Sequence, residues 1–371
     1  MREKTRNGAE TTYTYYSLDR LLSVTYSDGS SVSYEYDALN NRTKETYSNG
    51  DVKDYVYDAK YQLKEIKLNG QTTDTFTYNE SGAVVTHNDK TYTYDEWDRM
   101  SDYTDGTDTY TYKYDANGIR TQKNDKQYII DINNNVIAET DSTGTITDEI
   151  LWGHQPLARK VNGSWYYYIY NAHGDVVGLV NESGTVVNIY EYTPWGEIRS
   201  ESETVDNPIK YAGEYYDDEL DMIYLRARYY NPQIGRFTSL DIEEGEISNT
   251  LDMNRYVYCR NNPIKYTDPT GKSVTLTIGG ITIAGAAIVK GIVYLAGAAA
   301  GLIMAADLGK KVGEVLKTRK GSIQNAPKPP GTPGWDAIRD LTMAEILRRA
   351  QKGETGFKTI WKLLNDGRFK K

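Results

Sequence analysis

The sequence predicts a mainly β protein, built from antiparallel β-hairpin repeats and followed by a small α-helical tail. Three observations lead to this fold class. A Tyr-x-Tyr-Asp motif recurs along the first half of the chain, and Asn-Gly or Ser-Gly pairs separate its copies. The composition then changes abruptly, because 33 of the 34 tyrosines lie within residues 1–271.

The repeats are visible directly in the sequence. Related aromatic-x-Tyr motifs occupy residues 13–16, 34–37, 55–58, 76–79, 92–95 and 112–115. Self-similarity at a period of about 20–50 residues is the signature of a repeat architecture. We therefore expect residues 1–210 to form one array of similar units.

Each unit reads as two strands and a turn. Tyr34 and Tyr36 alternate with a polar residue, which is the pattern of a strand with one buried face. Residues 37–41 are rich in side chains that bond their own backbone and form turns. Residues 43–47 follow as the return strand, and Asn49-Gly50 suits a tight hairpin turn. Many short strands with such turns predict an antiparallel sheet.

Tyrosine is the dominant aromatic residue, with 34 copies against 4 phenylalanines. A phenol combines a large apolar ring with a polar tip that needs a partner or water. We expect the rings to be buried between neighbouring hairpins and the hydroxyls to reach solvent, which gives the sheet a wet inner face. The alternative is that tyrosine is abundant simply because it fits strands.

Residues 211–271 close the repeat array. The stretches GEYYDDELDMIYLRARYYNPQIGRF (213–237), RYVYCRNNPIKYTDP (255–269) and DPTG (268–271) resemble the core-associated segment of the bacterial Rhs/YD-repeat family. The resemblance implies that the repeats coil into a spiral β shell around a hollow interior. The array here is short and would form a partial shell, so we expect a piece of a longer protein or a small version of one.

The resemblance also implies a self-cleavage site after the DPTG turn, where aspartates act as an aspartyl-protease-like pair. The candidates are Asp268, Asp241 and the nearby Arg236. Such a pair requires one protonated and one ionised carboxyl group. Cleaving members usually have leucine after the glycine and a further aspartate downstream, whereas Lys272 follows here and the next acid is Asp307. The alternative is a rigid turn that ends the shell.

The distribution of charge and the scarcity of cysteine and histidine limit the functions that the chain can have. Residues 1–271 carry a net charge of −19 and residues 272–371 carry +10, so an acidic shell could hold a basic cargo by charge. The single cysteine, Cys259, excludes an internal disulfide and a CxxC zinc site, and we expect it to be a small buried core residue. With only three histidines in the chain, we expect no metal and no cofactor.

Residues 272–316 form an Ala/Gly-rich hydrophobic segment. Its stretch 273–306 contains no acid and one base, Lys290, and is long enough to contact or cross a membrane. The alternative is a helical hairpin that packs on protein, and residues 274–283 are β-branched enough to begin as a strand. Residues 317–334 contain four prolines and predict an extended linker.

Residues 335–371 predict a basic piece of two helices. Residues 342–345 have the spacing of a capping box, and the apolar residues of 357–364 recur at helical intervals. A basic surface of this kind suits a phosphate backbone, although most charge runs are simply solvated faces. The expected nucleic-acid contacts are Arg348, Arg349, Lys352, Lys358, Lys362 and Arg368.

The family resemblance implies that the tail is a variable toxin, often a nuclease, that is delivered into a competing cell. The tail contains no histidine and no cysteine, which excludes a histidine-based or zinc nuclease but permits a ribonuclease that uses carboxylates and basic groups. A carboxylate or lysine would take the 2′-hydroxyl proton, and arginine or lysine would stabilise the phosphate. The candidates are Asp340, Glu345, Arg349 and Lys358. The alternative is a tail that acts by binding or by membrane damage without catalysis.

Three functions therefore stay open: a carrier of an RNA-directed toxin for bacterial competition, a membrane-active toxin, and a non-enzymatic adhesin that binds carbohydrate through the repeats. We expect a secreted or cell-surface protein whose cargo acts in the cytoplasm of a target cell. The chain itself shows no signal peptide. The expected partners are an immunity protein, RNA, a membrane contacted through residues 273–306, and carbohydrate.

Overall fold

The structure, a computed structural model, describes residues 2–4, 10–153, 155–242, 253–278 and 281–283. All of these residues belong to one compact unit. The linker and the two helices expected in the tail lie outside the described residues. Within the described part of the chain, no helix is long and apolar enough to cross a membrane. Most of the stretch 273–306 is outside this part as well.

The repeats form a single open sheet of 21 antiparallel strands, in which each strand pairs with the next along the chain. The mainly β prediction is thereby confirmed. The strands are β1 (Arg2–Lys4), β2 (Glu10–Tyr15), β3 (Leu21–Thr25), β4 (Ser31–Tyr36), β5 (Arg42–Tyr47), β6 (Val52–Tyr57), β7 (Leu63–Leu68), β8 (Gln71–Tyr78), β9 (Val84–His87), β10 (Lys90–Tyr94), β11 (Met100–Thr104), β12 (Thr109–Tyr114), β13 (Arg120–Lys123), β14 (Lys126–Ile130), β15 (Val136–Thr140), β16 (Ile146–Trp152), β17 (Pro156–Val161), β18 (Ser164–Tyr170), β19 (Val176–Asn181), β20 (Val186–Tyr192) and β21 (Ile198–Glu203).

Where the motif ends in aspartate, that side chain anchors a turn. Asp37 Oδ1 accepts hydrogen bonds from the backbone N–H groups of Leu39 at 2.9 Å and Asn41 at 2.8 Å. A short polar side chain that bonds the backbone two and four residues on stabilises this loop locally. The same arrangement occurs at Asp58, Asp95, Asp115, Asp131 and Asp141.

In several motifs the second tyrosine donates a hydrogen bond to a carbonyl of an earlier strand. The Tyr36 hydroxyl donates to the carbonyl of Leu21 at 2.8 Å, and the Tyr57 hydroxyl donates to that of Arg42 at 2.8 Å. The expectation that these hydroxyls reach solvent is therefore wrong. The reason is that a carbonyl in a buried, irregular part of the ladder needs a donor, which the phenol supplies.

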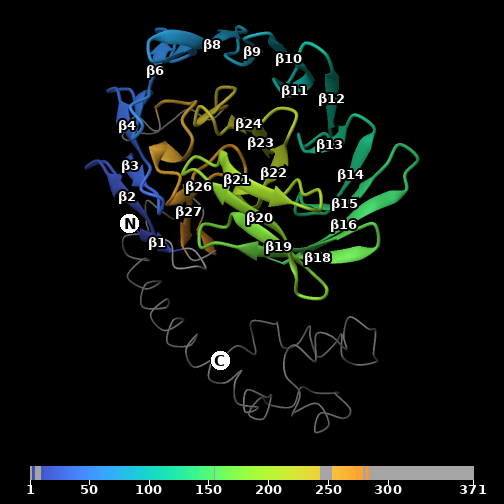
Figure 1. Ribbon diagram of the computed structural model, residues 1–371. Coiled ribbons are helices and arrows are strands. Elements are labelled where there is room, and N and C mark those ends of the chain that lie inside the picture. The colour runs from blue at the N-terminus through green and yellow to red at the C-terminus, as the bar shows by residue number, and fades with distance from the viewer. Residues whose placement is uncertain (1, 5–9, 154, 243–252, 279–280, 284–371) are drawn as a thin grey trace, which may run out of the picture. The chain divides into compact units, whose positions relative to one another are not determined.

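The sheet is curved, and its bulges coincide with the motif. The strand register shifts at the second tyrosine of successive repeats, for example at Tyr36, Tyr57, Tyr94 and Tyr114. A β-bulge bends its strand and increases the local twist. Figure 1 shows the strands of the repeats curving around the segment that follows them.

That core segment lies on the concave side of the sheet and forms the smaller sheet β22–β25. Its strand β26 belongs to another sheet, whose other strands, β27 and β28, follow the DPTG turn. The expectation that the stretch after residue 274 begins as a strand agrees with β27. The elements are η1 (Tyr211–Gly213), β22 (Tyr215–Asp217), β23 (Met222–Leu225), β24 (Arg228–Asn231), β25 (Arg236–Phe237), η2 (Cys259–Asn261), β26 (Tyr266–Thr267), β27 (Thr275–Ile278) and β28 (Ile281–Ile283).

The core segment is fixed to strands from all parts of the sheet. Asp217 pairs with the buried Arg120 of β13, and the Tyr215 hydroxyl donates to Glu139 of β15 at 3.0 Å. The side chain of Asn254 donates to the carbonyl of Leu39 at 3.0 Å. These contacts span much of the repeat array, so the core segment acts as its common support.

The two ends of the sheet also meet. Trp195, in the turn before β21, packs edge-on against Tyr34 with ring centroids 5.7 Å apart, and it stacks with the Arg42 guanidinium at 4.6 Å. Arg199 of β21 pairs with Asp28 in the turn between β3 and β4. Side chains thus join the last hairpin to the first repeats, although the strands are not paired there.

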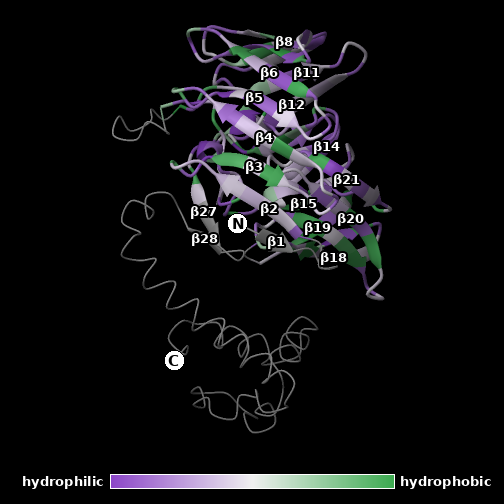
Figure 2. Cartoon of the chain, turned by 60° about the vertical axis from the view of Figure 1, so that its left-hand side comes forward, coloured by the Kyte–Doolittle hydropathy of each residue, from purple (hydrophilic) through white to green (hydrophobic). Residues whose placement is uncertain are grey.

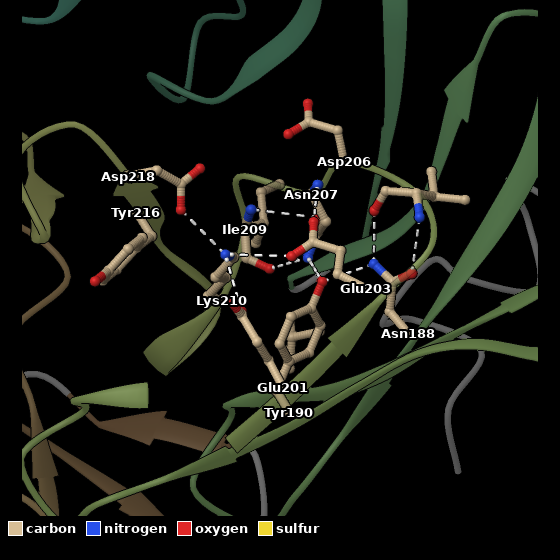
Figure 3. Close-up of polar contacts among 12 residues, drawn as sticks. Asn188, Tyr190, Glu201, Glu203, Asp206, Asn207, Ile209, Lys210, Tyr216 and Asp218 are labelled. Carbon is tan, nitrogen blue, oxygen red and sulfur yellow. Dashed lines mark hydrogen bonds and ion pairs between the residues drawn. The ribbon is translucent and has the colours of Figure 1, made fainter. Parts of the chain in front are cut away.

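A buried lysine connects β21 to the core segment (Figure 3). Lys210 Nζ lies 3.2 Å from Asp218 Oδ1 and 3.4 Å from carboxylate oxygens of both Glu201 and Glu203. Its ammonium group also sits 5.6 Å from the centre of the Tyr190 ring. The free-energy cost of burying the ammonium group is offset by these three carboxylates. The contacts therefore stabilise the junction between β21 and the core segment.

The outer face of the sheet is uneven in polarity. Figure 2 shows hydrophobic residues on the strands β18–β20. On these strands Val186 is 40% exposed and Ile189 is 53% exposed, and the aromatic ring of Tyr167 lies on the same sheet with the residue 44% exposed. Nothing in the described residues covers these side chains.

We expect Tyr57→Phe to destabilise the protein by about 1–2 kcal/mol, because the buried carbonyl of Arg42 loses its donor. The matched control is Tyr167→Phe on the exposed outer face, which should change stability by less than about 0.5 kcal/mol. Urea unfolding of both variants measures the difference. Equal stability of the two variants would contradict the role assigned to the Tyr57 hydroxyl.

Candidate functional site

Two of the predicted aspartates meet at one arginine at the end of the core segment. Arg228 begins β24, and its Nη2 lies 2.6 Å from Asp241 Oδ2 and 3.6 Å from Asp268 Oδ2. Asp268, which follows β26, is only 2% exposed. The structure therefore brings Asp241 and Asp268 to the same guanidinium group.

Arg236 is not placed with these aspartates. Its Nη1 donates to Asn41 Oδ1 at 2.9 Å, and its Nη2 donates to the carbonyl of Tyr61 at 2.6 Å. Its guanidinium also covers the Tyr57 ring at 4.9 Å. Arg236 thus fixes the core segment to the repeats. The arginine beside Asp241 and Asp268 is Arg228, and the prediction of Arg236 for that place is wrong.

The DPTG turn is held by the loop between β23 and β24. Three consecutive residues, the two of this loop and the first of β24, bind three consecutive carbonyl oxygens of the turn, one each. The contacts run from Arg226 Nη1 to Pro269, from the Ala227 N–H to Thr270 at 3.3 Å, and from Arg228 Nε to Gly271 at 2.5 Å.

Gly271 is required at this close approach. Its φ is +66°, and a Cβ atom added there would lie 2.4 Å from the carbonyl oxygen of Leu225. A side chain in that space would force the turn away from the loop, so the contacts above depend on glycine.

Asp268 binds the peptide that leaves the turn. Its Oδ1 accepts hydrogen bonds from the N–H groups of Lys272 at 3.2 Å and Ser273 at 3.1 Å, and from the Thr270 hydroxyl at 3.2 Å. The peptide bond between Gly271 and Lys272 thus has its carbonyl at Arg228 and its nitrogen at Asp268. The same carboxylate-to-backbone geometry closes the repeat turns, which is what a purely structural turn would also show.

Burial changes the acidity of two carboxyl groups here. Burial raises the pKa of Asp268 to about 6, although the nearby Arg228 acts in the opposite direction. Burial likewise raises the pKa of Glu214 to about 7, despite its 2.8 Å ion pair with Arg226. Both carboxyl groups therefore change charge closer to neutral pH than an ordinary Asp or Glu does, which is the range that acid–base chemistry uses.

Sequence reasoning missed Glu214, Arg226 and Arg228. Leu225 pairs directly with Arg228, so Arg226 and Ala227 alone form the hairpin loop, with Arg226 at φ +58°. Such loops are normally recognised by Asn-Gly or Asp-Gly, and neither is present. The spacing of two arginines around one alanine was the available signal.

The tail candidates cannot be compared with this cluster, because Asp340, Glu345, Arg349 and Lys358 lie outside the described residues, as do all the expected nucleic-acid contacts. The described ranges contain no group of three or more His, Cys, Asp or Glu side chains that could hold a metal ion. The carboxylates near Asp268 are neutralised by arginines instead.

A curved tyrosine-repeat sheet around a core segment that ends in DPTG defines an Rhs/YD-repeat protein. The chain belongs to the Teneurin YD-shell family, whose model matches residues 44–147 and 150–264; an RHS Repeat model matches residues 15–52.

The chain matches only a small part of the length of the relatives described next. The tRNA3(Ser)-specific nuclease WapA of Bacillus spizizenii is 42% identical over 127 residues, which is 33% of this chain and 5% of that protein. The tRNA nuclease WapA of Bacillus subtilis is 42% identical over 116 residues, or 30% of this chain and 5% of its own length. The crystal structure of TcdB2-TccC3 aligns with 73% of this chain and 19% of its own, at a TM-score of 0.40 and 18% identity.

We expect Gly271→Ala to destabilise the protein by about 1–3 kcal/mol more than Gly144→Ala does. Both glycines have positive φ, but nothing lies within 4 Å of a Cβ added at Gly144. The comparison therefore separates the close approach at Leu225 from backbone strain alone. Thermal or urea unfolding measures it, and equal losses would show that the turn is not held against the loop.

Proposed function

We propose that the YD-repeat unit is the carrier of a secreted toxin used in bacterial competition and that residues 272–371 are its cargo, acting on RNA. The observation that carries this proposal is the boundary at the DPTG turn. The acidic, tyrosine-rich core segment ends there, and the sequence beyond it is basic with a single tyrosine. Two relatives that share sequence with this chain are named as tRNA nucleases, which supports RNA as the target.

In this proposal the tail binds the RNA backbone through Arg348, Arg349, Lys352, Lys358, Lys362 and Arg368. Asp340 or Glu345 accepts the proton of the 2′-hydroxyl, which attacks the adjacent phosphorus. Arg349 and Lys358 stabilise the charge that develops on the phosphate. The producing cell requires an immunity protein, and the toxin acts in the cytoplasm of the target cell.

Expression of residues 272–371 inside bacteria should arrest growth and fragment RNA. Arg349→Ala should relieve both effects, because the phosphate loses a charged contact, whereas Lys290→Ala in the apolar segment should not. Growth curves and total RNA integrity measure the outcome.

Arrest with intact RNA and a collapsed membrane potential would contradict the proposal and favour the membrane-active alternative. Unaffected growth, with glycan binding by the repeats, would favour an adhesin.

We also propose that the chain cleaves itself between Gly271 and Lys272. The supporting observation is that this peptide bond lies between Arg228 at its oxygen and Asp268 at its nitrogen. Water adds its hydroxide to the carbonyl carbon of Gly271, and Arg228 stabilises the negative oxygen. Asp268 protonates the Lys272 nitrogen as the C–N bond breaks, and Asp241 takes the second proton of the water.

Purified full-length chain should separate into fragments of residues 1–271 and 272–371. Asp268→Asn should slow this at least 100-fold, because the amide keeps the hydrogen-bond acceptor of the turn but has no acidic proton. The control Arg199→Lys, far along the chain at the Asp28 contact, should cleave like the wild type. Intact mass spectrometry measures the rates, and a wild-type rate in the Asp268→Asn chain would refute the assignment.

A further inference from the structure

We propose that Glu214 and Arg226 form a positioning pair for the DPTG turn, in which Arg226 holds the Pro269 carbonyl and Glu214 controls how fully that guanidinium is available. The inference rests on the proposed self-cleavage, because the turn in question carries the bond to be cut. Neither residue touches that bond, so both act by positioning.

The geometry places one guanidinium between two acceptors. Arg226 Nη1 lies 2.8 Å from Glu214 Oε2, and the same nitrogen donates to the carbonyl oxygen of Pro269. One nitrogen with two N–H groups therefore serves both acceptors, and the negative charge of Glu214 draws it away from the carbonyl. Pro269 lies two residues before Gly271, and residues 226–228 bind the carbonyls of Pro269, Thr270 and Gly271 in turn, so the position of the first carbonyl bears on that of the third.

The pair is nearly enclosed by the protein. The side chain of Glu214 is 11% exposed and that of Arg226 is 22% exposed. Glu214 precedes β22, and Arg226 lies in the loop between β23 and β24, so the pair joins two parts of the core segment. An ion pair buried to this degree responds strongly to the loss of either charge.

Charged and titratable groups from several elements face Glu214. Arg226 and Asp268 act on it directly, and its own charge acts on Tyr170 of β18. A small pocket beside it is lined by further ionisable side chains, whose pKa values are all raised by their surroundings, so Glu214 is the lining group that changes charge near neutral pH. The side chains with ionisable groups around this pocket are Arg120, Tyr128, Tyr215 and Tyr224.

Protonation of Glu214 should tighten the turn. The burial of this carboxyl raises its pKa to about 7 from an ordinary value of 4.5, so its charge changes near neutral pH. Neutral Glu214 no longer attracts the guanidinium of Arg226. That group then interacts more strongly with the Pro269 carbonyl and with Asp268. Because the folded pKa lies above the unfolded one, the pair's contribution to stability falls as pH rises from about 4.5 to about 7.

The test is the cleavage rate of the full chain between pH 5 and 9. We expect the wild type to cleave several-fold faster at pH 6 than at pH 8. Glu214→Gln, which mimics the neutral carboxyl, should match the wild type at pH 6 and cleave faster than the wild type at pH 8. The fall in rate that this variant keeps reflects the loss of the Asp268 proton, because the pKa of that carboxyl is about 6. Arg226→Lys should be slow throughout, because a lysine cannot serve both acceptors in this geometry. Glu182→Gln, on an exposed turn, is the control and should follow the wild type.

A second measurement separates this proposal from the cleavage itself. Hydrogen exchange at the amides of Lys272 and Ser273, corrected for intrinsic rates, reports the tightness of the turn without any reaction. If the chain never cleaves but this protection changes near pH 7 only when Glu214 is present, the self-cleavage proposal is refuted and the positioning pair is supported. If cleavage occurs and Glu214→Gln keeps the wild-type pH profile, the positioning pair is overturned.

Discussion

The structure depends on the pairing of buried charges across the concave face of the repeat sheet. Arg120 of the sheet is enclosed by Asp217 and by the Tyr229 hydroxyl, which is 2.8 Å from its Nη1. Glu139 receives the Tyr215 hydroxyl from the core segment. A buried charge that lost such a partner would cost several kcal/mol. The sheet and the core segment therefore have to fold against each other, and neither face is satisfied alone.

This constraint makes the array differ from a linear repeat protein. In a solenoid each repeat contacts only its neighbours, and stability is a sum of local terms. Here the first repeats also contact the last hairpin through Arg42 and Trp195, and the core segment through Asn254. The DPTG turn is the end of the core segment. The positions of the carboxylates near it therefore depend on the contacts between the core segment and the repeat sheet.

The sequence predicted the features that are local and periodic. The turns at Asp37 and its equivalents, the antiparallel hairpins and the change of chemistry after Gly271 all follow from residue types at regular spacing. Contacts between distant segments could not be predicted this way. The hydroxyl of Tyr36 finds the carbonyl of Leu21 only because the sheet bends at a bulge.

In the site near the DPTG turn, too, local features were predicted and contacts between distant segments were not. Asp241 and Asp268 were found from their motifs, but the arginine between them was assigned to Arg236 because it is closer in sequence. The structure gives that place to Arg228, which a two-residue loop without glycine or asparagine brings to the turn. Glu214 carries no local signal, since its acidity arises from burial in the folded core.

Native-state hydrogen exchange of the full chain tests the central claim that sheet and core form one cooperative unit. The claim predicts that the backbone amides of β4–β7 and of β22–β24 open with the same free energy, because neither part is stable without the other. Loss of protection in β4–β7 at a distinctly lower free energy, with β22–β24 still protected, would contradict it and would return the array to an ordinary linear repeat.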